Sequence, residues 1–138
     1  MNARVHPAEW QVQIAVVDHL KLRALPGVFW FGVMNGGFKA DKRAIAKLKA
    51  MGLTPGVSDL CLIIRGHAYG LELKVPGGRQ TPEQIAAGEA WTAAGGTYAV
   101  ATGIDAALER LTEWGAIRPD GGARRMSDLL RDLDEVVP

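Results

Sequence analysis

Residues 59–75 read DLCLIIRGHAYGLELKV, which is two apolar runs separated by the dipeptide Gly66-His67. β-Branched and aromatic residues in both runs favour extended chain, and a two-residue connection that contains glycine is typical of a β-hairpin. We therefore predict antiparallel strands over 59–65 and 68–75, with Gly66-His67 as the loop. The stretch 60–64 is apolar on both faces, which indicates a central strand covered by helices on each side.

Periodicity and turn residues on either side of this hairpin predict the other elements. Pro7 is of the type favoured at the first position of a helix and opens a predicted helix over 7–25. The remaining predicted elements are, in chain order, a strand over 28–33, a helix over 41–51, a helix over 82–94, a strand over 97–101 and a helix over 104–116. This order of helices and strands indicates an α/β protein, a three-layer α/β/α domain.

Length and composition fit one domain. The chain has 138 residues, of which 48% are apolar and 22% charged, as in ordinary globular proteins. We place the domain at residues 1–117 and a polar tail at 118–138, in which 126–136 have the spacing of a short amphipathic helix. No apolar run reaches the roughly 20 residues of a membrane span, and the N-terminus lacks the apolar core of a secretory signal. Because Cys61 is the single cysteine, we expect no internal disulfide and a cytoplasmic setting.

Charge is divided unevenly along the chain. Residues 1–80 hold 11 Lys/Arg and 5 Asp/Glu, a net charge of +6, whereas residues 81–138 hold 5 and 10, a net charge of −5. A near-neutral total therefore hides a basic part suited to a polyanion. Within the predicted helix 41–51, one side is basic and the other apolar; the basic residues are Lys42, Arg43, Lys47 and Lys49. They are candidate phosphate contacts, and a merely solvated helix face is the alternative.

The predicted hairpin also gathers acidic groups. With Gly66-His67 as the loop, the numbers of paired residues add up to 133, so Asp59 lies opposite Lys74 and diagonal to Glu72 on one face. Two carboxylates beside an ammonium group suit Mg²⁺, which takes a few carboxylates, waters and phosphate oxygens. The alternative is a cross-strand ion pair between Asp59 and Lys74 with a solvated Glu72. A loop with an odd number of residues would turn Asp59 to the other face.

Two further polar positions bear on this site. Glu9 and Gln13 stand on one face of the first predicted helix, where a carboxylate in the first turn also interacts favourably with the helix dipole. Gln84 follows Thr81 at the spacing of a capping box, which alone could explain it. The glycine-rich stretches lack the motifs of nucleotide sites, so no nucleotide cofactor is expected.

Four segments occur in a fixed order: Glu9-x-x-x-Gln13, Gly56-Val57-Ser58-Asp59-Leu60, Leu71-Glu72-Leu73-Lys74 and Gly78-Arg79-Gln80-Thr81-Pro82-Glu83-Gln84. Together they resemble the VRR-NUC family of the PD-(D/E)XK nuclease superfamily, in particular its compact stand-alone members from phages and bacteria. The resemblance covers roughly residues 7–104. It implies a restriction-endonuclease-like fold in which a central mixed sheet of about four strands lies between helices.

By this resemblance, Asp59 and Glu72 are expected to be metal ligands, with the Leu73 carbonyl as a third. Lys74 is expected to orient the attacking water or to stabilise charge on the scissile phosphate. Glu9 is expected to reach a metal directly or through water.

The resemblance also implies that Gln84 supports the site from its helix, and we assign Gln13 a supporting role. One departure is visible, because the family usually has proline before the aspartate and this chain has Ser58. Proline supplies no ligand there, so we expect altered loop stiffness and unchanged chemistry.

The resemblance implies a Mg²⁺- or Mn²⁺-dependent DNA endonuclease that acts on branched DNA such as Holliday junctions and works as a homodimer. Two alternatives remain at this point. One is a nuclease that prefers nicks, flaps or ordinary duplex, and the other is a non-catalytic DNA-binding module of the same fold.

Overall fold

The computed structural model describes residues 7–34 and 41–119, and its elements follow the predicted order. They are α1 (Glu9–Arg23), β1 (Val28–Gly32), α2 (Lys42–Ala50), β2 (Leu60–Ile64), β3 (His67–Lys74), α3 (Pro82–Ala93), β4 (Thr97–Thr102) and α4 (Ile104–Glu113). The predicted helix over 126–136 lies outside the described residues. None of the helices in the described ranges is long and apolar enough to cross a membrane.

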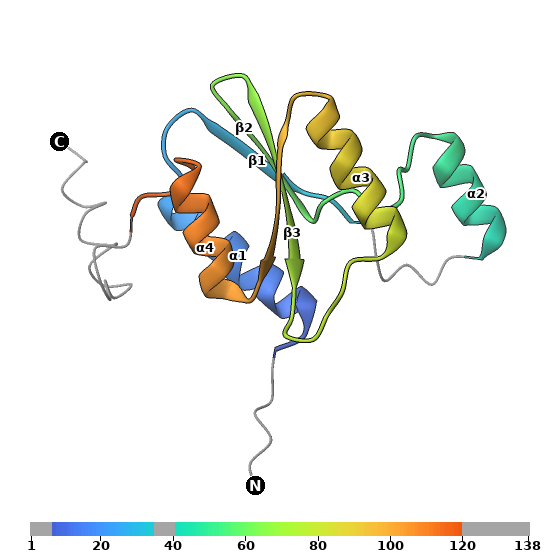
Figure 1. The fold of residues 1–138 in the computed structure, drawn as a ribbon, viewed down its shortest axis with the longest axis horizontal. Coiled ribbons are helices and arrows are strands. Elements are labelled where there is room, and N and C mark those ends of the chain that lie inside the picture. Colours follow the sequence, from blue (N-terminus) through green and yellow to red (C-terminus); the bar gives the residue numbers. More distant parts are fainter. Residues whose placement is uncertain (1–6, 35–40, 120–138) are drawn as a thin grey trace, which may run out of the picture.

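The four strands form one mixed sheet in the order β1-β2-β3-β4 (Figure 1). β1 and β2 pair antiparallel, β2 and β3 pair antiparallel, and β3 and β4 pair parallel. The parallel pair requires a crossover, and α3 supplies it. The predicted α/β class with a central mixed sheet of four strands is therefore confirmed.

Helices cover both faces of the sheet, which confirms the three layers. On one face, α1 and α4 pack over the strands. The core there comprises Val12, Val16, Leu20, Leu60, Leu62, Leu71, Leu73, Ala101, Ala107, Leu111, Ala116 and Ile117. On the other face, α3 lies over β3 and β4. The Trp91 indole N–H donates to the Thr97 carbonyl at 2.9 Å, and a Cβ on Gly88 would come within 2.6 Å of the Tyr98 ring. Only a residue without a side chain allows α3 to approach β4 this closely.

The hairpin turn differs from the prediction by one residue. Ile64 pairs with His67, so the loop is Arg65-Gly66 and the numbers of paired residues add up to 131. Both loop residues have positive φ, 51° for Arg65 and 79° for Gly66, as a tight hairpin turn of matching twist requires. His67 is held in the strand because its imidazole hydrogen-bonds the Thr97 hydroxyl at 2.7 Å.

The ends of α1 also differ slightly from the prediction. The helix begins at Glu9, two residues after Pro7, because the Ala8 N–H is satisfied by the Gln11 side-chain oxygen at 2.8 Å. Near its other end, the buried Arg23 guanidinium donates to the Arg118 carbonyl. The chain after α4 is thereby tied to α1, while the domain boundary at residue 117 stays a prediction.

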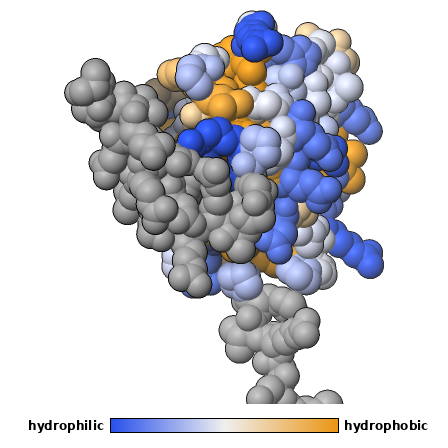
Figure 2. Space-filling view, turned by 90° about the vertical axis from the view of Figure 1, so that its left-hand side faces the viewer, coloured by the Kyte–Doolittle hydropathy of each residue, from blue (hydrophilic) through white to orange (hydrophobic). Residues whose placement is uncertain are grey.

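Seen from the side that carries α4, the described surface is a mixture of hydrophilic side chains with an apolar area near the top (Figure 2).

Candidate metal centre

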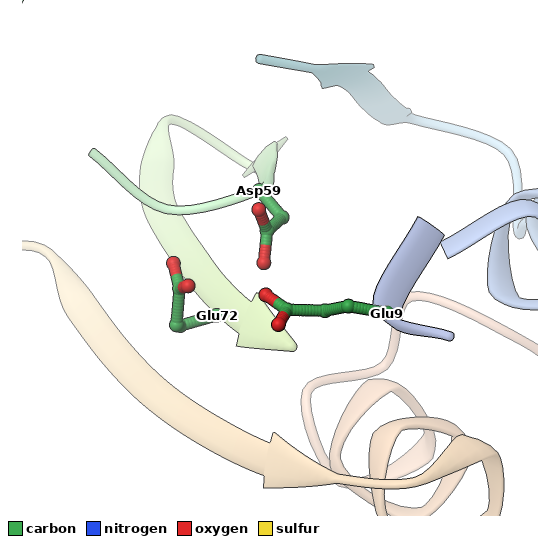
Figure 3. Close-up of side chains that lie close together, drawn as sticks. All are labelled: Glu9, Asp59 and Glu72. Carbon is green, nitrogen blue, oxygen red and sulfur yellow. The ribbon is translucent and has the colours of Figure 1, made fainter. Parts of the chain in front are cut away.

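Three carboxylates from separate elements point toward one another at one end of the sheet (Figure 3). Glu9 belongs to the first turn of α1, Asp59 directly precedes β2, and Glu72 lies in β3. One carboxylate oxygen of each lies within 4.8 Å of the corresponding oxygens of the other two. The structure thus brings together residues that are 13 to 63 positions apart in the sequence.

The observed register corrects the predicted pairing of Asp59. Continued by one step beyond β2, it places Asp59 directly opposite Glu72, where the prediction had Lys74. The predicted loop and the observed loop both contain two residues, so the partner of Asp59 shifts by an even number of residues along β3. An even shift keeps Asp59, Glu72 and Lys74 on one face of the sheet. The Asp59 carboxylate also accepts the Leu73 backbone N–H at 2.8 Å, which fixes the acidic side chain against the neighbouring strand.

Glu72 is the buried centre of the cluster. It is 1% exposed, and one of its oxygens, Oε1, accepts a hydrogen bond from the Gln84 side-chain amide at 2.9 Å. Its other oxygen, Oε2, is buried without a hydrogen-bond partner in the described structure. A buried carboxylate oxygen left without a partner is costly unless a proton or a cation satisfies it.

Gln84 makes the capping contacts considered from the sequence and also contacts Glu72, while its role in supporting the site stays a prediction. Its side-chain oxygen accepts the Thr81 N–H at 2.8 Å, and the Thr81 hydroxyl accepts the Gln84 N–H at 3.2 Å, which is the expected capping box. Its side-chain nitrogen remains free to donate to Glu72. The cap therefore locks the amide in an orientation that holds the carboxylate.

Lys74 supplies the positive charge of the site. Its ammonium nitrogen lies 3.5 Å from Glu72 Oε1 and 3.7 Å from Glu9 Oε1, and the residue is 6% exposed. The Glu9 side chain, in contrast, is 44% exposed and reaches the cluster from the solvent side. One ammonium beside three carboxylates leaves the cluster with excess negative charge when all three are ionised.

That excess is reflected in the acid–base properties of the two strand carboxylates. Burial raises the pKa of Glu72 to about 8, and the nearby negative charge of Asp59 adds to the rise against the opposing effect of Lys74. Burial also raises the pKa of Asp59, although the hydrogen bond from Leu73 acts in the opposite direction. Without a cation, the protein therefore favours a proton in the cluster near neutral pH.

Gly56 and Ser58, which precede Asp59 and were given no site role from the sequence, make close contacts in the structure. Gly56 has a φ of +82°, and a Cβ there would come within 2.3 Å of the Glu83 carbonyl oxygen at the start of α3. The Pro55-Gly56 dipeptide was a turn signal that could have indicated this position. Ser58, which stands where the family usually has proline, is 2% exposed, and its hydroxyl lies 3.6 Å from the Cys61 sulfur.

The remaining residues predicted for the site are Gln13, the basic residues of α2 and the Leu73 carbonyl, and the structure places them differently relative to the carboxylate cluster. The Gln13 side-chain amide donates to the Asp59 carbonyl at 3.4 Å, a long contact beside the cluster. The four basic residues of α2 are exposed and lie outside the carboxylate cluster; they are Lys42, Arg43, Lys47 and Lys49. A metal-binding role for the Leu73 carbonyl stays a prediction.

The carboxylate cluster fits a divalent cation. Its donors are carboxylate oxygens, which hard cations such as Mg²⁺ and Mn²⁺ prefer. The unpartnered Oε2 of Glu72 offers a ligand atom that no protein group occupies in the described structure. A cation would also replace the proton that the raised pKa of Glu72 favours. Asp59, Glu72 and Glu9 would hold it.

Comparisons with known proteins agree with the fold. No model of a protein family matches the chain, and no curated protein matches it. Among solved structures, a "VRR_NUC domain protein" is similar at 21% identity and a TM-score of 0.64, over 83% of this chain and 98% of the other. A second, described as "VRR_NUC domain", is similar at 19% identity and a TM-score of 0.52, over 76% and 94%. The chain has the fold of these domains, as the sequence resemblance implied.

The raised pKa of Glu72 predicts how the stability of the metal-free protein changes with pH. Below about pH 4.5, Glu72 is protonated in both the folded and the unfolded chain. Between about pH 4.5 and 8, the unfolded chain loses this proton and the folded chain keeps it, so the free energy of unfolding falls as pH rises. The unfolding temperature measured in a chelator should therefore decrease over this range, and Glu72→Gln should flatten the decrease.

Glu89→Gln is the matched control, because Glu89 is an exposed carboxylate of α3 outside the cluster. It should keep the wild-type dependence of the unfolding temperature on pH. An identical dependence in Glu72→Gln and in the wild type would contradict the assignment.

Proposed function

We propose that this chain is a member of the VRR-NUC family and a divalent-cation-dependent DNA endonuclease, with Mg²⁺ or Mn²⁺ as the cofactor. The observation that carries the proposal is the convergence of Glu9, Asp59 and Glu72 beside Lys74. One buried Glu72 oxygen has no hydrogen-bond partner within residues 7–34 and 41–119. The similarity in fold to solved VRR_NUC domains supports it. A DNA-binding module without catalysis would have no use for a buried, costly carboxylate of this kind.

The proposed reaction is hydrolysis of a phosphodiester bond by water. A bound cation would lower the pKa of a water and neutralise charge on the phosphate. Gln84 fixes the Glu72 carboxylate, and the Leu73 N–H fixes that of Asp59, so both ligands are held before substrate arrives. The Lys74 ammonium carries three N–H donors and can hold the attacking water or a phosphate oxygen. Glu9, on the solvent side, lies where a cation with its waters would enter.

The proposed substrate is branched DNA such as a Holliday junction, and the proposed assembly is a homodimer. A two-fold dimer presents two equivalent sites, which matches the approximate two-fold symmetry of a four-way junction. The basic residues of α2 are proposed phosphate contacts because they are exposed and grouped on one short helix.

The first experiment tests hydrolysis. The full chain with Mg²⁺ or Mn²⁺ should cut labelled DNA, and a chelator should abolish the cutting. Asp59→Asn, Glu72→Gln and Lys74→Ala should each lower the cleavage rate by roughly 10²- to 10³-fold or more, because each removes a group that stabilises the charge of the reaction. Glu89→Gln should cut at the wild-type rate. Cleavage that survives both the chelator and Glu72→Gln would contradict the proposed function.

A panel of substrates tests the preference for branched DNA. Four-way junctions, flaps, nicked duplexes and linear duplexes of the same sequence should be compared at equal concentration. We expect the junction to be cut at least tenfold faster than the linear duplex. Equal cleavage rates on all four substrates would contradict the preference for branched DNA, although they would still be consistent with an endonuclease.

The basic side of α2 can be tested without cleavage. Lys47→Glu together with Lys49→Glu should weaken DNA binding for all substrates and reduce the slope of log K against log[salt] by roughly 1.8, since each lost phosphate contact contributes roughly 0.9. Binding should be measured in a chelator at several salt concentrations. An unchanged slope would indicate that the basic side of α2 does not contact phosphates and is an ordinary solvated surface.

A further inference from the structure

A cleft of about 580 Å³ opens at the end of the sheet that is remote from the metal centre. Three turns border it, at residues 25–28 between α1 and β1, at residues 64–67 between β2 and β3, and at residues 114–115 after α4. Figure 1 shows the turn between β2 and β3 at the opposite end of the sheet from the start of α1, which carries Glu9. The volume is within the roughly 300–1,000 Å³ of small-ligand pockets, and no step of the proposed hydrolysis uses this cleft.

Three aromatic rings line the cleft as one contiguous group. The ring centroids of His67 and Tyr69 are 4.8 Å apart, and those of Tyr69 and Trp114 are 4.9 Å apart. The hydrogen bond between the His67 imidazole and the Thr97 hydroxyl, at 2.7 Å, fixes the first ring. The three aromatic residues are only half-buried, so their rings keep surface that a flat ligand can contact.

The polar groups of the cleft suit an anion that also accepts hydrogen bonds. Within residues 7–34 and 41–119, neither the Tyr69 hydroxyl nor the Trp114 indole N–H makes a hydrogen bond, and the exposed Arg65 makes no ion pair. No aspartate or glutamate is among the described residues that line the cleft. The guanidinium group of an arginine can bind a phosphate through two parallel hydrogen bonds. The lining therefore favours a ligand that carries both a flat ring and a phosphate.

We propose that this cleft binds a nucleoside monophosphate unit, with the base against Tyr69 and Trp114 and the phosphate on Arg65. Aromatic side chains bind bases of any sequence by stacking, and the free hydroxyl and indole N–H can donate to acceptor atoms of the base. An apolar peptide would leave the guanidinium and both donors without partners. Inorganic phosphate alone would leave the rings uncovered.

The cleft is separate from the metal centre. His67 and Glu72 are five residues apart in β3, about 17 Å along the strand, and Tyr69 lies on the sheet face opposite to Glu72. Two sources supply the same nucleotide chemistry, namely a free nucleotide and an unpaired nucleotide of a DNA strand. Binding of a free nucleotide is independent of the proposed function. Binding of a DNA strand rests on the proposed function and would anchor the strand away from the cleavage site.

Calorimetric titration of the full chain in a chelator tests the proposal without cleavage. AMP should bind with a dissociation constant below about 1 mM, and adenosine and inorganic phosphate should each bind roughly fivefold more weakly or worse, because each lacks one half of the unit. Arg65→Asn should weaken AMP binding to a similar extent, and asparagine tolerates the φ of 51° at this position. Arg79→Asn is the matched control, because Arg79 is an exposed arginine outside the cleft. Absence of AMP binding, or equal weakening in both variants, would overturn the proposal.

Trp114→Phe tests the aromatic contact with a variant that keeps a ring in place. It should bind AMP more weakly than the wild type, and wild-type affinity in this variant and in Arg65→Asn would overturn the proposal.

A single-stranded oligonucleotide and a blunt duplex of equal length, titrated in the same chelator, separate the two sources. Weaker binding of the single strand by Arg65→Asn, with duplex binding unchanged, would support the DNA strand as the source. Weaker binding of AMP alone would support a free nucleotide. A chain that binds AMP in this cleft and cuts no DNA would contradict only the nuclease function, and a chain that cuts DNA without binding AMP would overturn only this inference.

Discussion

The site depends on the burial of one carboxylate. Glu72 is 1% exposed and has one oxygen without a hydrogen-bond partner among the residues that the structure describes, a state that folding must offset elsewhere in the core. The groups around it each limit that cost: Gln84 donates a hydrogen bond, Lys74 lies at 3.5 Å, and the raised pKa favours a proton. A divalent cation would satisfy the remaining oxygen. The hairpin, the α3 cap and the start of α1 all converge on this carboxylate.

Much of the fold and of the strand-borne site could be predicted from the sequence because both depend on local patterns. The apolar runs of the hairpin gave the central strands, and a two-residue loop sufficed to put Asp59 and Glu72 on one face. The position of that loop was wrong by one residue. The sequence does not separate Arg65-Gly66 from Gly66-His67, since each contains one glycine, and the contact of His67 with Thr97, thirty residues away, favours the observed turn.

What the sequence could not provide are the contacts made between elements. The distance of Glu9 from Lys74 depends on how α1 lies against the sheet, and the dual use of Gln84 depends on how α3 approaches β3. The unpartnered Glu72 oxygen is likewise a property of the packed molecule. The amphipathic pattern of α2 was evident from the sequence, but only the structure shows that Ala44 and Ile45 are partly buried while Leu48 is exposed.

The central claim, that Glu9, Asp59 and Glu72 hold a divalent cation, is tested most directly by diffraction. Crystals of the chain soaked in Mn²⁺ should show an anomalous-difference peak between the carboxylates of Asp59 and Glu72, and crystals of Asp59→Asn treated in the same way should lack it. A peak absent from this position in well-ordered wild-type crystals, or a Lys74 ammonium found in its place, would contradict the account.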